Sequence, residues 1–99
     1  MDPEPVVLIN AFEVPAGEDE AFLQGWERAR CFVATQEGYL STKLHRSLSP
    51  EADFRFVNVA LWRSAEAFRA ATSRPEFRNA PVPYPLHSSL YEIVREDRR

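Results

Sequence analysis

The sequence predicts an α+β fold of the ferredoxin-like type, with a four-stranded antiparallel sheet built in the order β-α-β-β-α-β. Apolar residues recur with a period of two in four segments and at helical spacing in two others, and the segments alternate in that order. The first and third predicted strands are apolar on both faces, as expected for the central strands of a covered sheet. A chain of 99 residues forms one domain, which we expect to span residues 1–99.

The first half of the chain supplies a strand, a helix and a second strand. The first strand is predicted over residues 6–14 and stops at Pro15-Ala-Gly17. A helix follows over residues 18–35, because acidic residues in its first turn favour the positive end of the helix dipole. Its buried face is predicted to consist of Phe22, Trp26, Ala29 and Val33. Gly38 ends this element, and the second strand covers residues 39–48.

The second half repeats the pattern. A third strand is predicted over residues 54–62, and Ser64 is placed as the N-cap of a helix with Phe68 and Ala71 inward. This helix should end before Pro75, because the residue before a proline avoids helical geometry. The segment 73–76 has the capping-box pattern that restarts a short helical turn. The last strand is predicted over residues 88–94.

The third strand has two different faces. Alternate side chains of a strand share a face, which gives one face of Phe54, Phe56, Asn58, Ala60 and Trp62. The other face consists of Arg55, Val57, Val59 and Leu61. Two helices can cover only one face of such a sheet, so the second apolar face needs another cover. We therefore predict a homodimer packed sheet against sheet.

Composition excludes several classes of partner. The net charge of −3 and an isoelectric point near 5.4 disfavour binding to nucleic acid or to an anionic membrane. The longest aliphatic run, Val6–Ile9, is too short to span a bilayer or to form the core of a signal peptide. A single cysteine, Cys31, allows no internal disulfide, which fits a reducing cytoplasm.

Asn58 and Trp62 are the candidate site residues of the third strand. A lone amide among aromatic side chains either bonds a neighbouring backbone group or is aimed at a bound molecule. Trp62 either packs in the core or offers a pocket its indole N–H and an aromatic wall. Asn10 shares a face of the first strand with Leu8 and Phe12, and it should meet Asn58 across the central strands.

The remaining polar candidates are less specific. Arg78 is either a surface or dimer-edge cation or the group that holds a phenolate or carboxylate. His45 is expected on an exposed face of the second strand together with Tyr39, Ser41 and Lys43, and Cys31 is expected to be exposed. His87 could line a pocket mouth or bind a metal, although no second ligand stands at metal spacing. We find no Ser-His-Asp order, phosphate-binding glycine loop or paired carboxylates.

Three segments carry a family resemblance. Residues 6–17, 37–40 and 56–68 resemble the antibiotic biosynthesis monooxygenase family, and the similarity extends over about residues 6–94. The resemblance implies a dimeric α+β barrel with a pocket between the helices and the sheet of each subunit. This agrees with the homodimer predicted from the two apolar faces.

One branch of that family resembles small enzymes that oxidise phenolic compounds to quinones with molecular oxygen alone. The resemblance implies catalytic roles for Asn58, Trp62 and Arg78, with no flavin, metal or other cofactor. It also implies a pocket for a small aromatic molecule, with substrate-binding positions at Asn10, Phe12, Trp26, Leu44, Phe56 and Phe68. Leu44 and Phe68 stand where this branch has tyrosine hydroxyls, and no general base stands out.

A second branch degrades heme with an asparagine, a tryptophan and an iron-ligating histidine. Asn10 fits the first role, whereas Ala71 stands at the tryptophan position and Pro81 at or near the histidine position. The prediction is therefore a cytoplasmic homodimeric monooxygenase that oxidises a phenol or hydroquinone. The alternatives are a heme-binding protein with His87 as an iron ligand and a non-catalytic dimer that binds a small molecule.

Overall fold

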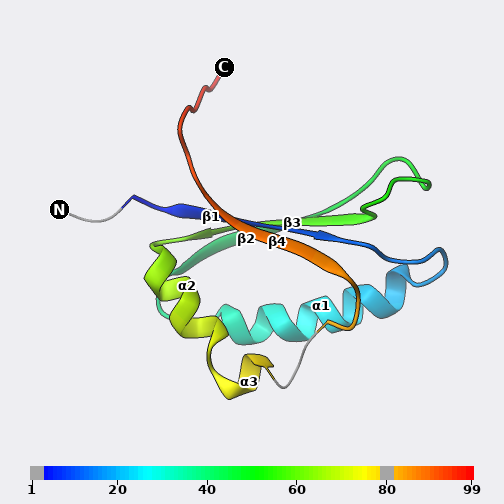
Figure 1. Cartoon of the computed structure of the whole chain (residues 1–99), viewed down its shortest axis with the longest axis horizontal. Helices are drawn as coiled ribbons and strands as arrows, with labels where there is room; N and C mark the ends of the chain where they lie inside the picture. The colour runs from blue at the N-terminus through cyan, green and yellow to red at the C-terminus, as the bar shows by residue number, and fades with distance from the viewer. Residues whose placement is uncertain (1–3, 79–81) are drawn as a thin grey trace.

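The elements follow the order that the sequence predicts. A computed structural model describes residues 4–78 and 82–99, and of Arg78 it describes the backbone only. In chain order the elements are β1 (Val6–Phe12), α1 (Asp19–Val33), β2 (Tyr39–Arg46), β3 (Phe56–Trp62), α2 (Ala65–Thr72), α3 (Pro75–Arg78) and β4 (Leu86–Glu92). The ferredoxin-like β-α-β-β-α-β order is thereby confirmed, with α3 as a short addition after α2 (Figure 1).

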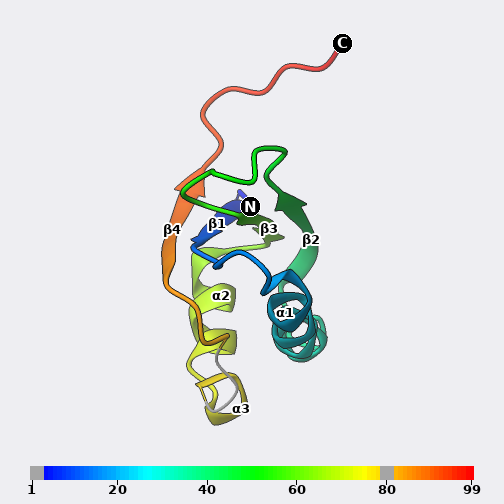
Figure 2. The ribbon, with the colours of Figure 1, turned by 90° about the vertical axis from the view of Figure 1, so that its right-hand side faces the viewer.

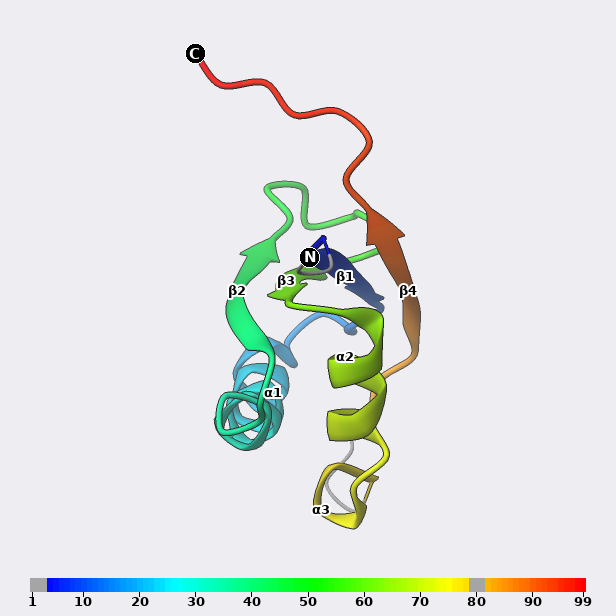
Figure 3. The same ribbon diagram turned by 90° about the vertical axis from the view of Figure 1, so that its left-hand side faces the viewer.

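The sheet has the strand order β2-β3-β1-β4, and each neighbouring pair is antiparallel. The two strands predicted to be central, β1 and β3, are central. Both long helices lie on the same face of the sheet, side by side, as the two end-on views show (Figures 2 and 3). The opposite face, called the outer face below, has no helix over it within residues 4–78 and 82–99.

The register of the central pair brings the two asparagines together. Asn10 of β1 lies directly opposite Asn58 of β3, as the sequence predicts. Burial along β3 alternates as well: Phe56, Asn58, Ala60 and Trp62 are buried under the helices, and the residues between them are half-buried on the outer face. The period of two in the sequence therefore reports the two faces of this strand correctly.

Phe54 departs from that prediction. β3 begins only at Phe56, after a bend, so the alternation does not extend back to Phe54. Its ring instead packs edge-on against His87, with 5.1 Å between the ring centroids. Because His87 is the partner of Ala11 in β1, it lies on the outer face of the sheet. Phe54 therefore does not share the face of Phe56.

Tyr39 also departs from its predicted face. The register of β2 against β3 shifts by one residue between Tyr39 and Ser41, which is a β-bulge. Tyr39 pairs with Trp62 and lies on the helix side, whereas Ser41 pairs with Leu61 on the outer side. The prediction that Tyr39 shares the exposed face of Ser41, Lys43 and His45 is wrong for Tyr39 only. The other three are exposed, as expected.

The helix ends follow local chemistry. The Ser64 hydroxyl accepts a hydrogen bond from the backbone N–H of Ala67 at 3.1 Å, so the predicted N-cap of α2 is confirmed. The Ser73 hydroxyl donates back to the Arg69 carbonyl at 2.6 Å, and α3 starts at Pro75. Gly38 adopts a φ of 92°, and a β-carbon there would lie 2.4 Å from the Ala67 side chain. This close approach joins the start of β2 to α2.

Two apolar clusters fill the space between helices and sheet. The first consists of Leu8, Ala60, Trp62 and Ala71. The second, called the aromatic cluster below, consists of Phe12, Phe22 and Phe56. Phe22 of α1 is fully buried and stacks on Phe56 at 4.4 Å between centroids. Among the described residues, no helix is both long enough and apolar enough to cross a membrane.

An ion pair fastens the start of α1 to the sheet. Arg55 Nη2 lies 2.9 Å from Asp19 Oδ2, and its hydrogen bond lowers the pKa of Asp19. A carboxyl whose pKa falls on folding stabilises the protein above its unfolded pKa of about 3.9, and the contribution is lost as pH falls through the lower folded pKa. We therefore expect Asp19→Asn to lower the melting temperature at pH 7. The difference in melting temperature between the variant and the wild type should become smaller as the pH approaches 2. Melting curves of both proteins between pH 7 and pH 2 measure this difference. A difference that stays constant with pH would contradict the stabilising role of the ion pair.

Candidate functional site

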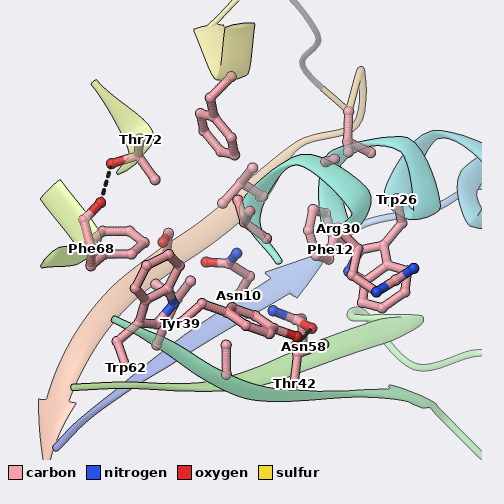
Figure 4. Close-up of a pocket in the computed structure, with 18 residues that line it drawn as sticks. Asn10, Phe12, Trp26, Arg30, Tyr39, Thr42, Asn58, Trp62, Phe68 and Thr72 are labelled. Carbon is pink, nitrogen blue, oxygen red and sulfur yellow. Dashed lines mark hydrogen bonds between the residues drawn. The ribbon is translucent and has the colours of Figure 1, made fainter. Parts of the chain in front are cut away.

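A cavity of about 460 Å³ lies between the helix-facing side of the sheet and the two long helices. This volume lies within the ~300–1,000 Å³ that is typical of small-molecule sites. Six of the residues predicted for the site line it: Asn10, Phe12, Trp26, Asn58, Trp62 and Phe68. Figure 4 shows that the sheet residues among them converge on the cavity from below, and that Trp26 and Phe68 reach it from the helices.

Two predicted pocket residues do not line this cavity. Phe56 is only 1% exposed and belongs to the aromatic cluster, and Leu44 packs against the same cluster. Both residues lie on the predicted face of the sheet, but the Phe22 ring covers Phe56, and Leu44 packs against the aromatic cluster. The remaining predicted site residue, Arg78, ends α3, and its side chain lies outside the part of the chain that the structure describes.

A polar row crosses the otherwise apolar floor of the cavity. Ser88 of β4 lies opposite Asn10, and Asn10 lies opposite Asn58. The Asn58 side chain is 6% exposed, and its Oδ1 accepts a hydrogen bond from the Thr42 hydroxyl at 2.7 Å. Its partner is therefore a side chain rather than the backbone group considered from the sequence. With its oxygen held by Thr42, the amide presents its NH₂ group to the cavity (Figure 4).

Two buried polar atoms of this site have no hydrogen-bond partner among the described residues. They are Asn10 Oδ1, an acceptor, and Trp62 Nε1, a donor. A buried group left unpaired costs roughly 1–3 kcal/mol. Both atoms belong to residues that line the cavity, so its wall holds one unpaired acceptor and one unpaired donor.

Aromatic rings hold the Trp62 indole in place. Tyr39 and Phe68 each meet it edge-to-face, both with 5.6 Å between centroids and with interplanar angles of 85° and 79°. Tyr39 comes from β2 and Phe68 from α2, so the indole is fixed from two elements. The orientation of its N–H is therefore set before any ligand binds.

The structure adds lining residues that the sequence reasoning missed, among them Arg30, Tyr39, Thr42 and Ser88. Arg30 follows Trp26 by one helical turn, and this spacing could have identified it. Thr42 is two residues from Leu44 on the same strand face and could have been found in the same way. Tyr39 could not, because the bulge at position 40 reverses its face.

Arg30 is the only formally charged side chain among the described residues that line the cavity. Its Nε donates to Glu27 at 2.9 Å, and Nη2 also contacts this carboxylate. The hydrogen bonds to Glu27 raise the pKa of Arg30, so the guanidinium is charged at any physiological pH. The site thus has neutral amides on its floor and one cation on the α1 side.

Neither of the two histidines reaches the cavity. His87 lies on the outer face with its Nε2 3.1 Å from Glu13 Oε2, and it is exposed. His45 is exposed, with Nδ1 3.1 Å from the Val57 carbonyl oxygen. Within residues 4–78 and 82–99, no group of three or more His, Cys, Asp or Glu residues could hold a metal. The suggestion that His87 lines the pocket mouth is therefore wrong.

Comparison with known proteins places the chain in a family. The family model described as antibiotic biosynthesis monooxygenase matches residues 5–81. The chain belongs to this family. A candidate monooxygenase from Shewanella loihica PV-4, solved as a crystal structure, is 38% identical with a TM-score of 0.86, covering 97% of this chain and 99% of the other. The crystal structure of SnoaB, a cofactor-independent oxygenase from Streptomyces nogalater, is 25% identical with a TM-score of 0.76, covering 95% and 97%.

Curated relatives represent two chemistries. Deoxynogalonate monooxygenase from Streptomyces nogalater is 34% identical over 77 residues, which are 78% of this chain and 63% of the relative. A mycobilin-producing heme oxygenase from Mycobacterium tuberculosis is 37% identical over 71 residues, which are 72% of this chain and 66% of the relative. The chain thus spans just under two thirds of the length of these relatives. Family membership alone does not distinguish between the two chemistries. The distinction has to be argued from the residues of this chain.

Proposed function

We propose that the protein is a cofactor-independent monooxygenase that oxidises an electron-rich phenol or hydroquinone with molecular oxygen. The observation that carries the proposal is the Asn58 amide, whose NH₂ group is aimed into an apolar cavity because Thr42 holds its oxygen. A donor fixed in this way stabilises developing negative charge without having to reorganise. The family and the relatives named as monooxygenases support the same reaction class.

The polar row would bind the substrate through its oxygen atoms. A phenolate oxygen accepts hydrogen bonds from the Asn58 NH₂ group and from Trp62 Nε1, while a second hydroxyl donates to Asn10 Oδ1. The aromatic walls of Trp26 and Phe68 contact the ring system. These hydrogen bonds stabilise the phenolate and so favour loss of the phenol proton to water, and a phenolate is a better electron donor than the neutral phenol. The predicted role of Arg78 in holding the substrate stays a proposal.

The reaction needs no other redox partner than oxygen. The bound phenolate passes one electron to O₂, and the resulting superoxide and substrate radical combine at the ring carbon para to the oxygen. The hydroperoxide formed there loses water: the O–O bond breaks, the C–H proton leaves, and the carbon becomes a carbonyl. One oxygen atom enters the quinone, and the other leaves as water with the two hydrogens that the substrate gives up. No flavin or metal takes part in these steps.

Heme is the ligand of the other relatives, and the donor set here does not match a histidine-ligated heme. Both histidines lie on the outer face or its rim, and Cys31 is exposed on α1 outside the cavity lining. Asn10 is present, but Ala71 is a small buried residue where the heme-degrading branch has a tryptophan. Pro81, near the histidine position of that branch, lies outside the described residues.

Oxygen consumption by metal-free, flavin-free protein tests the proposal. Anthrone and 1-naphthol, which both carry hydrogen on the carbon para to the oxygen, serve as probes, with quinone absorbance and an oxygen electrode as the two readouts. We expect quinone formation above the spontaneous rate with one O₂ consumed per quinone. A rate equal to that of buffer with every probe would contradict the proposal. In a parallel titration with hemin, a Soret shift with ascorbate-dependent loss of heme would indicate the heme-degrading chemistry instead.

We also propose that the protein works as a homodimer joined through the outer face. The central strands present Val7, Ile9, Val57, Val59 and Leu61 there, all half-buried and without a covering helix among the described elements. An uncovered apolar sheet face of this kind is typical of an interface. The single cysteine, exposed and unpaired, is compatible with the reducing cytoplasm that we propose as its location.

The outer face gives a direct test of the dimer. Val59→Glu places a charge in the middle of this face, and we expect it to convert a dimer into a monomer in sedimentation velocity at micromolar concentration. Arg28→Glu, at an exposed position of α1 on the other side of the sheet, is the matched control and should leave the dimer intact. A wild-type protein that sediments as a monomer would disprove the dimer without touching the proposed chemistry.

A further inference from the structure

Tyr39 brings a phenol hydroxyl into the cavity from a position that the sequence pattern assigns to the exposed face. The β-bulge between Tyr39 and Ser41 turns its side chain to the helix side, where it pairs with Trp62. Its ring stands edge-to-face on the indole at 5.6 Å, so it has a fixed place beside a candidate catalytic residue (Figure 4). The branch of the family that oxidises phenols is expected to have hydroxyls at the positions of Leu44 and Phe68, which this chain lacks.

The other hydroxyls of the cavity wall are already engaged or peripheral. Thr42 donates to Asn58, and Thr72 donates to the Phe68 carbonyl at 3.0 Å. Ser88 is exposed on the edge strand β4. The backbone N–H of Tyr39 donates to the Gln36 carbonyl at 3.3 Å, but among the described residues its side-chain hydroxyl has no hydrogen-bond partner and is available to a ligand. A phenol is also a far stronger acid than an aliphatic hydroxyl.

Arg30 supplies a positive charge near this phenol. Both residues line the same cavity. The hydrogen bond with Glu27 is the largest cause of the raised pKa of Arg30, and the Coulomb interaction with Tyr39 is a smaller one. A cation on the wall of the same cavity favours the negative charge that develops on bound oxygen atoms during the reaction.

We propose that Tyr39 is a catalytic residue that transfers protons when the substrate hydroperoxide collapses to the quinone, which rests on the proposed function. As the O–O bond breaks, its electron pair leaves with the outer oxygen, and the Tyr39 hydroxyl gives its proton to that oxygen to form water. In the same step the Tyr39 oxygen takes the C–H proton from the carbon that is being oxidised. The electron pair of the C–H bond becomes the second bond of the new carbonyl, and Tyr39 stays neutral. The carbon is oxidised, and the peroxide oxygen is reduced.

Tyr39→Phe isolates this role because it keeps the ring against Trp62 and removes only the hydroxyl. We expect quinone formation to fall about 100-fold, the lower end of the usual ~10²–10⁴-fold contribution of a general acid or base. Oxygen uptake should continue to the hydroperoxide, which accumulates and is detected by iodide titration or mass spectrometry. A solvent deuterium isotope effect on quinone formation should be present in wild type and absent from the variant. Tyr91→Phe, an exposed tyrosine outside the cavity, is the matched control.

The outcomes separate the two proposals. Quinone formation by Tyr39→Phe at the wild-type rate, without accumulated peroxide, overturns the role of Tyr39. If Asn58→Ala still loses activity in that case, the monooxygenase function stands without Tyr39. A wild-type protein that consumes no oxygen above the buffer rate overturns the proposed function and with it the role of Tyr39. Loss of both oxygen uptake and quinone in Tyr39→Phe also contradicts the proposal, because the residue would then act before the peroxide forms.

Discussion

Asn58→Ala is expected to lower the rate of oxygen uptake by about 10²–10³-fold, with little change in the folded fraction. Removing one preorganised donor to a developing anion has this size of effect in other enzymes. Asn58 NH₂ is such a donor, because it is fixed by Thr42 on a buried wall. Initial rates with an oxygen electrode at saturating anthrone measure the effect, and circular dichroism checks the fold.

Thr42 variants give the matched control for the orientation of the amide. Thr42→Val keeps the shape of the side chain and removes the hydrogen bond to Asn58 Oδ1. The loss of a bond with a net value of roughly 1 kcal/mol should slow oxygen uptake about fivefold. Thr42→Ser retains the hydroxyl and should stay near wild type. If Asn58→Ala turns over at the wild-type rate, the amide has no part in the reaction, whatever Thr42 does.

Periodicity predicts the parts of the site that lie on regular strands. Alternation in the third strand places Asn58 and Trp62 on one face, and the antiparallel central pair then puts Asn10 opposite Asn58. A one-residue error in either strand would have moved the amide of that strand to the outer face, so the agreement is informative. The same periodicity predicts the strand order, because strands that are apolar on both faces have to be central in the sheet.

The residues that the sequence misplaces lie where regular geometry ends or where another element fills the space. Tyr39 changes face at a bulge, and Phe54 lies before the first residue of β3. Phe56 and Leu44 are on the correct face, but Phe56 lies under the Phe22 ring of α1 and Leu44 packs against the aromatic cluster. Strand periodicity contains no information on which side chains of a distant helix occupy the space above a given strand residue. Only the tertiary packing separates the aromatic cluster from the cavity.

That packing implies the largest effect on stability. Phe22 is fully buried, stacks on Phe56 at 4.4 Å and meets Phe12 and Tyr84 edge-on at 4.9 and 5.7 Å. We expect Phe22→Ala to reduce the free energy of unfolding by about 3–5 kcal/mol, because it removes a buried ring and leaves a cavity. Small domains have only about 5–15 kcal/mol in total, so this variant should be close to unfolding at 37 °C.

Phe54→Ala is the matched control, because the same atoms are removed from a side chain that is 38% exposed. The decrease in the free energy of unfolding should be smaller for Phe54→Ala than for Phe22→Ala by at least about 2 kcal/mol, because water already reaches part of the Phe54 ring. Urea unfolding followed by tryptophan fluorescence gives both values. Because Phe22 does not line the cavity, the variant should still turn over substrate at 10 °C, where its folded fraction is high. Equal decreases in the free energy of unfolding in the two variants would show that α1 is not anchored on the sheet through Phe22. A fully folded but inactive Phe22→Ala would show that the aromatic cluster shapes the cavity directly.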